Sequence, residues 1–312
     1  MNKWIGHIYL LFAFLLAGTS VISARLVAGR LGTFTIASSS LFFALLFLLP
    51  ACLKKLMKTL VQVSLNDFLF LLVQAICGIF LFRMFLLYGM LFTSSMEAGI
   101  ITGATPAFTA LLSIILLKEP VSFKKLTGII CTVGGILMIQ GLHTECGFNI
   151  KHMGGNLLVL LAAASESTFN IFSRVFAIKV QSSKKELMPP LVQTTLVSLM
   201  AFILCLVPAL FESPLQTLSG IGLKEWLSLF WYGLFVTALA FIFWYAGIKR
   251  CSAFTAAAFS GMMPFTSMIL SVLILGESSE WQQWLGGGLV ICGIILIGTK
   301  SRAIGILELH LK

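Results

Sequence analysis

Long apolar runs separated by short polar connectors dominate the pattern of this 312-residue chain. A helix needs about 20 predominantly apolar residues to cross the hydrocarbon core of a bilayer. Ten such runs can be placed, at residues 4–24, 32–50, 68–88, 95–117, 124–141, 154–177, 189–211, 225–247, 253–275 and 281–299. The pattern predicts an all-α membrane protein with ten transmembrane helices embedded in a lipid bilayer.

The predicted spans leave only short connectors, and hydrophobic residues make up 59% of the chain against 10% charged residues. A separate globular catalytic domain is therefore not expected. The first span has a competing interpretation as a signal peptide, since Ser23, Ala24 and Arg25 resemble a cleavage region. We interpret it as a retained span, because the topology described next needs it.

The net charge of +10 is compatible with a nucleic-acid partner, but the distribution of the basic residues indicates a membrane topology instead. With the N-terminus inside, sixteen Lys and Arg residues fall on the inner side, and four fall on the outer side: Arg25, Arg30, Lys151 and Lys224. Basic residues concentrate on the cytoplasmic side of membrane proteins. We therefore predict that both termini are cytoplasmic and that no nucleic acid binds.

The chain carries an internal repeat. Sliding the sequence by 158 residues superposes identical residues, among them Gly89 and Gly247, Ser94 and Ser252, Ala98 and Ala256, Pro106 and Pro264, Glu119 and Glu277, Gly128 and Gly286, and Gly135 and Gly293. We predict a first five-helix repeat at 1–141, a connector at 142–153, a second five-helix repeat at 154–299 and a cytoplasmic tail at 300–312. Five spans per repeat place the second repeat in the membrane upside down relative to the first, which is an inverted repeat.

The ten-span plan and two paired segments, residues 97–119 and 256–277, resemble the EamA-type transporters of the drug/metabolite transporter superfamily. The paired segments include Pro106 and Glu119 in the first repeat and Pro264 and Glu277 in the second. The resemblance implies a bacterial inner-membrane carrier that works by alternating access, commonly an exporter of amino acids or related metabolites. It does not specify the solute.

Pro106 and Pro264 are predicted to lie in the middle of the fourth and ninth spans. Proline has no N–H, so each residue frees a carbonyl group one turn earlier, at Thr102 and Ser260. Helix breaks at matched positions of two inverted repeats point to a substrate site or a hinge. A kink that serves packing alone is the alternative interpretation.

Ionisable side chains within the hydrocarbon are costly, which makes them candidates for the site. Glu166 lies near the middle of the sixth span, and Asn170 and Arg174 follow on the same helical face. Because burial disfavours a charged carboxyl group, Glu166 is expected to take up and release a proton during transport. The alternative is a neutral Glu166 that only braces the bundle.

Arg83, in the third span, and Glu97, at the outer start of the fourth, fall at similar depth. As a pair they would close an outer gate or hold the carboxylate and ammonium groups of a zwitterion. The alternative leaves Glu97 at the interface and lets Arg83 reach the lipid headgroups.

Trp244 and Tyr245 lie deep in the eighth span, beside Phe241. They belong either to the packed core or to the wall of a hydrophobic or cation-binding cavity.

Other function classes lack their chemistry. The cysteines are scattered singly, so neither a metal site nor a disulfide framework is predicted. Residues 293–300 miss the phosphate-binding loop pattern, so no nucleotide cofactor is predicted. The chain has one aspartate, Asp67, and no histidine deep in a span, which disfavours an intramembrane enzyme. A channel would need a continuous polar pore.

We therefore predict a secondary-active transporter with a small-molecule substrate, either coupled to protons or uniporting, and most consistent with export of amino-acid-like solutes. An intramembrane enzyme, a channel, and carriers of nucleoside-type metabolites or cationic drugs are the alternatives.

Overall fold

The computed structural model describes residues 3–117, 123–141, 150–182, 188–250, 259, 262–279 and 281–298. The described residues of the first half form α1 (Lys3–Val27), α2 (Thr33–Leu60), α3 (Leu65–Ala75), η1 (Ile76–Leu81), α4 (Phe82–Gly89), α5 (Ser95–Thr102), α6 (Thr105–Leu117) and α7 (Phe123–Gly141). Those of the second half form α8 (Ile150–Ser182), α9 (Pro190–Leu210), α10 (Pro214–Ser219), α11 (Leu223–Trp231), η2 (Tyr232–Leu239), α12 (Ala240–Ile248), α14 (Met262–Leu275) and α15 (Trp281–Gly298). Here η denotes a π-helical segment.

Helix is present within each of the ten predicted spans. In the described part of the chain, six continuous stretches are long and apolar enough to cross a membrane: Trp4–Val27, Thr33–Leu60, Leu65–Gly89, His152–Ser173, Pro190–Leu210 and Leu223–Ile248. Shorter apolar helices lie at Leu126–Gly135, Met262–Leu275 and Trp281–Leu296. A helical fold of the described residues with several membrane spans is therefore confirmed, while the total of ten spans stays a prediction.

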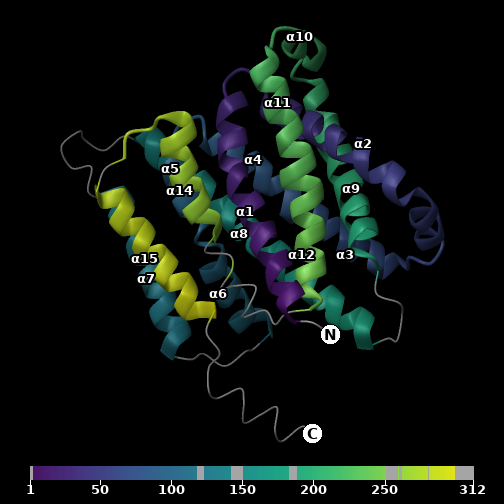
Figure 1. The fold of residues 1–312 in the computed structure, drawn as a ribbon, viewed down its shortest axis with the longest axis horizontal. Helices are drawn as coiled ribbons and strands as arrows, with labels where there is room; N and C mark the ends of the chain where they lie inside the picture. Colours follow the sequence, from purple (N-terminus) through teal and green to yellow (C-terminus); the bar gives the residue numbers. More distant parts are fainter. Residues whose placement is uncertain are drawn as a thin grey trace, which may run out of the picture.

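The two halves are interleaved (Figure 1). On the left of the view α7 lies beside α15, and on the right α2 lies beside α9. Between these pairs, α1 packs against α12 and α14, and α8 packs against α4 and α6. Each of these contacts joins a helix of the first half to a helix of the second half, so the centre of the molecule is built from both.

The fourth predicted span is not one continuous helix, because α5 ends at Thr102 and α6 begins at Thr105. Pro106 has no N–H to donate to the Thr102 carbonyl, so the regular helical bonding cannot pass through this point. At the break the backbone uses bonds that span three residues, such as Gly103 N–H to Ile100 O at 2.9 Å. The break thus lies at the freed carbonyl, about one turn before the proline.

The third and eighth predicted spans each contain a π-helical segment, which the sequence pattern does not reveal. A shift of 158 residues carries 76–81, the range of η1, onto 234–239, within η2. Single π-helical turns inside α-helices are frequent at functional sites. Because the two segments lie at matched positions, a helix of each half is widened at the same place.

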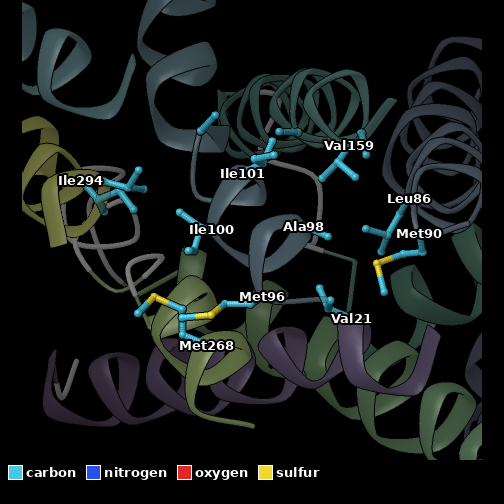
Figure 2. Packing of buried hydrophobic residues seen from close by; sticks show 14 residues of the cluster. Val21, Leu86, Met90, Met96, Ala98, Ile100, Ile101, Val159, Met268 and Ile294 are labelled. Carbon is cyan, nitrogen blue, oxygen red and sulfur yellow. The ribbon is translucent and has the colours of Figure 1, made fainter. Parts of the chain in front are cut away.

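The helix α5 is enclosed by other helices, and all eight of its residues are buried. Figure 2 shows the side chains that surround it from α1, α4, α8, α14 and α15: Val21, Leu86, Val159, Met268 and Ile294. Its backbone also approaches α14 closely, since a Cβ atom on Gly99 would lie 2.3 Å from Ser267 Cβ. Small residues allow membrane helices to pack at this range. The break after α5 is therefore a feature of the protein interior.

Candidate functional site

A cavity of about 80 Å³ lies in the middle of the bundle, between α1, α8, α14 and the helices that carry the two π-helical segments. One water needs roughly 10–15 Å³ by the same measure, so the cavity has room for a small solute. Its wall is mostly apolar and aromatic and consists of Ala13, Phe14, Ala17, Ser20, Gly78, Ile79, Phe82, Arg83, Glu166, Phe169, Asn170, Tyr232, Val236, Ala240, Phe241, Trp244 and Met263. The ionised or ionisable groups of opposite sign in this wall are Arg83 and Glu166.

Arg83, in α4, is 4% exposed. Its guanidinium group donates to the carbonyl of Ala37 at 3.2 Å and to the hydroxyl groups of Ser40 and Thr237. The guanidinium carbon also lies 4.2 Å from the centre of the Tyr232 ring, a cation–π contact. Among the described residues no carboxylate pairs with Arg83. The cavity therefore contains a buried cation whose direct partners are neutral.

Glu166 approaches the cavity from α8, and Asn170 lines it one helical turn further along. The Oε2 atom of Glu166 lies 2.9 Å from Thr105 Oγ1, at the start of α6. The side chain of Arg174, which we expected on the same face, lies outside the described side chains. The structure thus brings Arg83, Glu166 and Asn170 to one cavity.

The helix break at Thr102 lies close to the second predicted proline. A Cβ atom on Gly103 would be 3.2 Å from Pro264 Cγ, and Pro264 is itself buried. Pro106 and Thr102 are buried as well. The elements predicted to carry the matched breaks therefore meet inside the protein, while Ser260 lies outside the described residues.

Arg83 and Glu97 do not form the expected pair. The Glu97 carboxylate accepts hydrogen bonds from Asn156 Nδ2 at 3.0 Å and Gln283 Nε2 at 3.3 Å, and it lies 3.4 Å from His152 Nε2. Glu97 faces α8 and α15, whereas the contacts of Arg83 run to α2 and η2. Similar depth does not fix the direction in which a side chain leaves its helix, which is why the expectation failed.

Trp244 and Tyr245 have different environments although they are neighbours in α12. Trp244 lines the cavity, whereas the Tyr245 hydroxyl donates to Gln74 Oε1 at 3.0 Å. The same oxygen accepts hydrogen bonds from Ser173 Oγ at 3.2 Å and Gln193 Nε2 at 3.1 Å. We call these four residues the glutamine cluster. It joins α3 of the first half to α8, α9 and α12 of the second half. The Tyr245 ring also lies 6.3 Å from the rings of Phe169 and Phe241 in the cavity wall.

The glutamine cluster and the partners of Glu97 were not predicted, because only ionisable groups within the spans were taken as candidates. A signal was present: Gln74 and Gln193 are amides inside apolar spans, where a polar side chain needs a partner. Both are buried.

The variant Tyr245→Phe is expected to lower the stability of the protein by roughly 0.6 kcal/mol, the average worth of a hydrogen bond between membrane helices. Tyr232→Phe is the matched control, because the Tyr232 hydroxyl is buried without a hydrogen-bond partner among the described residues. Unfolding of both variants in detergent would be compared with that of the parent. Equal stability of the two variants would show that the glutamine cluster does not hold the helices together.

Two carboxylates from connectors cap helices of the other half. Glu277, one of the residues paired by the repeat, accepts the backbone N–H groups of Ser95 and Met96 at 3.1 and 3.0 Å. Glu212 accepts those of Phe34 and Thr35 at 3.2 and 2.7 Å. A carboxylate at a helix N-terminus satisfies free N–H groups and the helix dipole. Both residues therefore support the frame around the cavity.

Comparison with known proteins gives two matches to one family model: residues 4–141 and 153–299 each match the EamA-like transporter family. An uncharacterized transporter of Bacillus subtilis, YetK, is 32% identical over 97% of this chain and 89% of its own length. A probable amino-acid metabolite efflux pump of Salmonella typhimurium is 27% identical over 64% of this chain and 66% of its own length. A protein crystal structure superposes with a TM-score of 0.64 over 100% of both chains at 18% identity, which shows a shared fold.

Proposed function

Because the chain belongs to the EamA-like transporter family, we propose that it is a secondary-active carrier that exports small amino-acid-like metabolites across the bacterial inner membrane. The observation that carries this proposal is the central cavity, where Arg83 and Glu166 stand on different helices within an aromatic wall. Alternating access would expose this cavity first to one side of the membrane and then to the other.

The chemistry of the cavity fits a zwitterion. Arg83 offers a guanidinium fork that suits a carboxylate, and charge-assisted bonds of this kind are the stronger hydrogen bonds. Glu166 and Asn170 offer oxygen acceptors for an ammonium group, and the aromatic rings suit an apolar side chain. The zwitterion site that we expected between Arg83 and Glu97 is thereby reassigned to Arg83 and Glu166. The name of the Salmonella typhimurium relative agrees with this solute class.

A lipophilic cation is the second candidate solute, because Glu166 and the rings of Phe169, Phe241 and Trp244 form a wall that suits an organic cation. Arg83 opposes this candidate. Its positive charge is buried beside the same cavity and would repel the solute.

We propose ten spans in two inverted halves as the frame for this transport. The two family matches, the π-helical segments at matched positions and the pairing of α2 with α9 support this architecture. The start of α3 and the start of α11 add a further match, because Asp67 and Glu225, 158 residues apart, each accept the N–H group three residues earlier.

A labelling experiment would test the orientation. In a variant without the native cysteines, a cysteine at the exposed position Ser278 is expected to react with a membrane-impermeant reagent in intact cells. A cysteine at the exposed position Lys55 is expected to be protected, because the basic connector faces the cytoplasm. The reverse result would overturn the proposed topology.

The proposed function is tested with purified protein in liposomes, through saturable counterflow of amino acids, nucleosides and cationic drugs. We expect thermal stabilisation and counterflow with zwitterionic amino acids. Counterflow restricted to cationic drugs would favour the second candidate. Unsaturable ion flux would indicate a channel and overturn the assignment as a carrier.

A further inference from the structure

The hydroxyl group of Thr105 lies within hydrogen-bonding distance of two oxygen atoms, but it has only one hydrogen to donate. Its Oγ1 atom lies 2.8 Å from the carbonyl oxygen of Thr102 and 2.9 Å from Glu166 Oε2. A hydroxyl group donates one hydrogen bond and accepts others. The direction of these two bonds therefore depends on whether Glu166 carries a proton.

With Glu166 protonated, all three oxygen atoms are satisfied. The carboxylic acid donates to Thr105 Oγ1, and Thr105 donates to the Thr102 carbonyl. With Glu166 ionised, the carboxylate can only accept, so Thr105 must donate to it and release the Thr102 carbonyl. The O–H bond of Glu166 breaks, and the proton forms a new bond to a water molecule or to a basic group of the solute in the cavity.

The Thr102 carbonyl is the group that Pro106 frees, and it stands at the break between α5 and α6. Thr102 is 1% exposed, so a lost partner cannot be replaced from bulk water without a rearrangement. The Thr105 carbonyl in turn lies 2.7 Å from Ser167 Oγ of α8, whose single hydroxyl hydrogen can go to this carbonyl or to that of Ala163 at 2.8 Å. Thr105 therefore contacts α8 through both its side chain and its backbone.

We propose that Thr105 is a positioning residue that transmits the protonation state of Glu166 to the break between α5 and α6. The inference rests on the proposed function, because it assumes that Glu166 exchanges protons during transport. Protonation would favour the arrangement in which the break is held by Thr105, and deprotonation would release the break and allow α5 and α6 to change their relative position.

Of the titratable groups described around Glu166, its own carboxyl group is the one that we propose to control the break between α5 and α6. Arg83 of α4 lines the same cavity as Glu166. Of the other helices packed on α8, α3 has Asp67 bonded to its own first turn, and α5 has Glu97 bonded to Asn156. Among the described residues, the other titratable groups on this side are His152, which lies 3.4 Å from Glu97, Cys77 of η1, and the phenols Tyr232 and Tyr245.

The test compares Thr105→Val and Thr105→Ala with Thr105→Ser and with Thr109→Val. Thr109 is the matched control, because its hydroxyl donates to the Thr105 carbonyl in the same helix and has no bond to Glu166. We expect Thr105→Val and Thr105→Ala to reduce the change of counterflow rate with pH about tenfold. The serine variant and Thr109→Val should keep the parental profile. A parental pH profile in the valine or alanine variant would overturn the proposal.

An infrared measurement decides the matter independently of transport. The carbonyl stretch of protonated Glu166, identified by its loss in Glu166→Gln, is expected to shift in Thr105→Ala and to keep its position in Thr109→Val. An unshifted band, or no such band in the parent at acidic pH, would overturn the proposal. Failure of the parent to transport any solute would instead count against the proposed function.

Discussion

Replacing Arg83 with glutamine is expected to lower the apparent affinity for zwitterionic amino acids between tenfold and a hundredfold, roughly the worth of one hydrogen bond to a charged group. Glutamine can still donate to Ser40 or Thr237, so the contacts between α4 and its neighbours are partly kept. The charge that would hold the solute carboxylate is lost. Counterflow in liposomes, measured as a function of solute concentration, gives the affinity directly.

Two further variants separate charge from position. Arg83→Lys keeps the charge but loses the planar fork, so an intermediate affinity is expected. Arg25→Gln is the matched control, because Arg25 also donates to a backbone carbonyl, that of Met90, but does not line the cavity. Arg83→Gln with parental affinity for amino acids, or equal losses in Arg83→Gln and Arg25→Gln, would contradict the assignment of Arg83 to the carboxylate.

The helices and the approximate location of the candidate site could be predicted from the sequence, because the bilayer imposes strong constraints on both. Only long apolar helices fit the hydrocarbon layer, so the runs of apolar residues predict where the helices lie. An ionisable residue in such a run is costly to expose to lipid, and it therefore faces the protein interior. Glu166 and Arg83 were found in this way, and the structure brings both to one cavity.

The pairing of side chains could not be predicted, because it depends on rotation about helix axes and on local changes of helix pitch. Successive residues of a helix point about 100° apart, so Trp244 lines the cavity while Tyr245 faces the glutamine cluster. The π-helical segments add further rotation, and nothing in the pattern of apolar residues indicates them. Arg83 lies two residues after the end of η1, which is one reason why depth alone gave the wrong partner for it.

A helix break before Pro106 could be predicted, since a proline inside a helix always frees a carbonyl. The consequence of this break could not be predicted, because the Thr105 hydroxyl, which donates to the freed carbonyl, also contacts Glu166 in the other half of the chain. A local rule of helix chemistry and a long-range contact meet in one side chain. Such a coincidence arises only in the folded protein.

The second large effect is expected for Glu166→Gln, and Glu212→Gln is its matched control. Glu212 caps α2 at a distance from the cavity wall, and it also accepts a hydrogen bond from the Thr35 hydroxyl. The amide oxygen can still accept the two bonds that Oε2 receives from Thr35, whereas the bond from the Phe34 N–H group to Oε1 is lost. Because this change lies away from the cavity wall, counterflow and its pH dependence are expected to match those of the parent. This variant shows how much a carboxyl-to-amide change costs where no proton exchange is proposed.

Glu166→Gln is expected to fold and to lose the pH dependence of counterflow, with a rate at least about tenfold below that of the parent at its best pH. The glutamine amide can donate to Thr105 Oγ1 as a protonated carboxyl group would, so it fixes the arrangement in which Thr105 holds the Thr102 carbonyl. An amide carries no exchangeable charge, so raising the pH can no longer release the break. The counterflow rate of the variant is therefore expected to resemble that of the parent at acidic pH and to differ from it increasingly as the pH rises. Counterflow measured in liposomes from mildly acidic to mildly alkaline pH would test this, and a parental rate with a parental pH profile would reduce Glu166 to a residue that only braces the bundle.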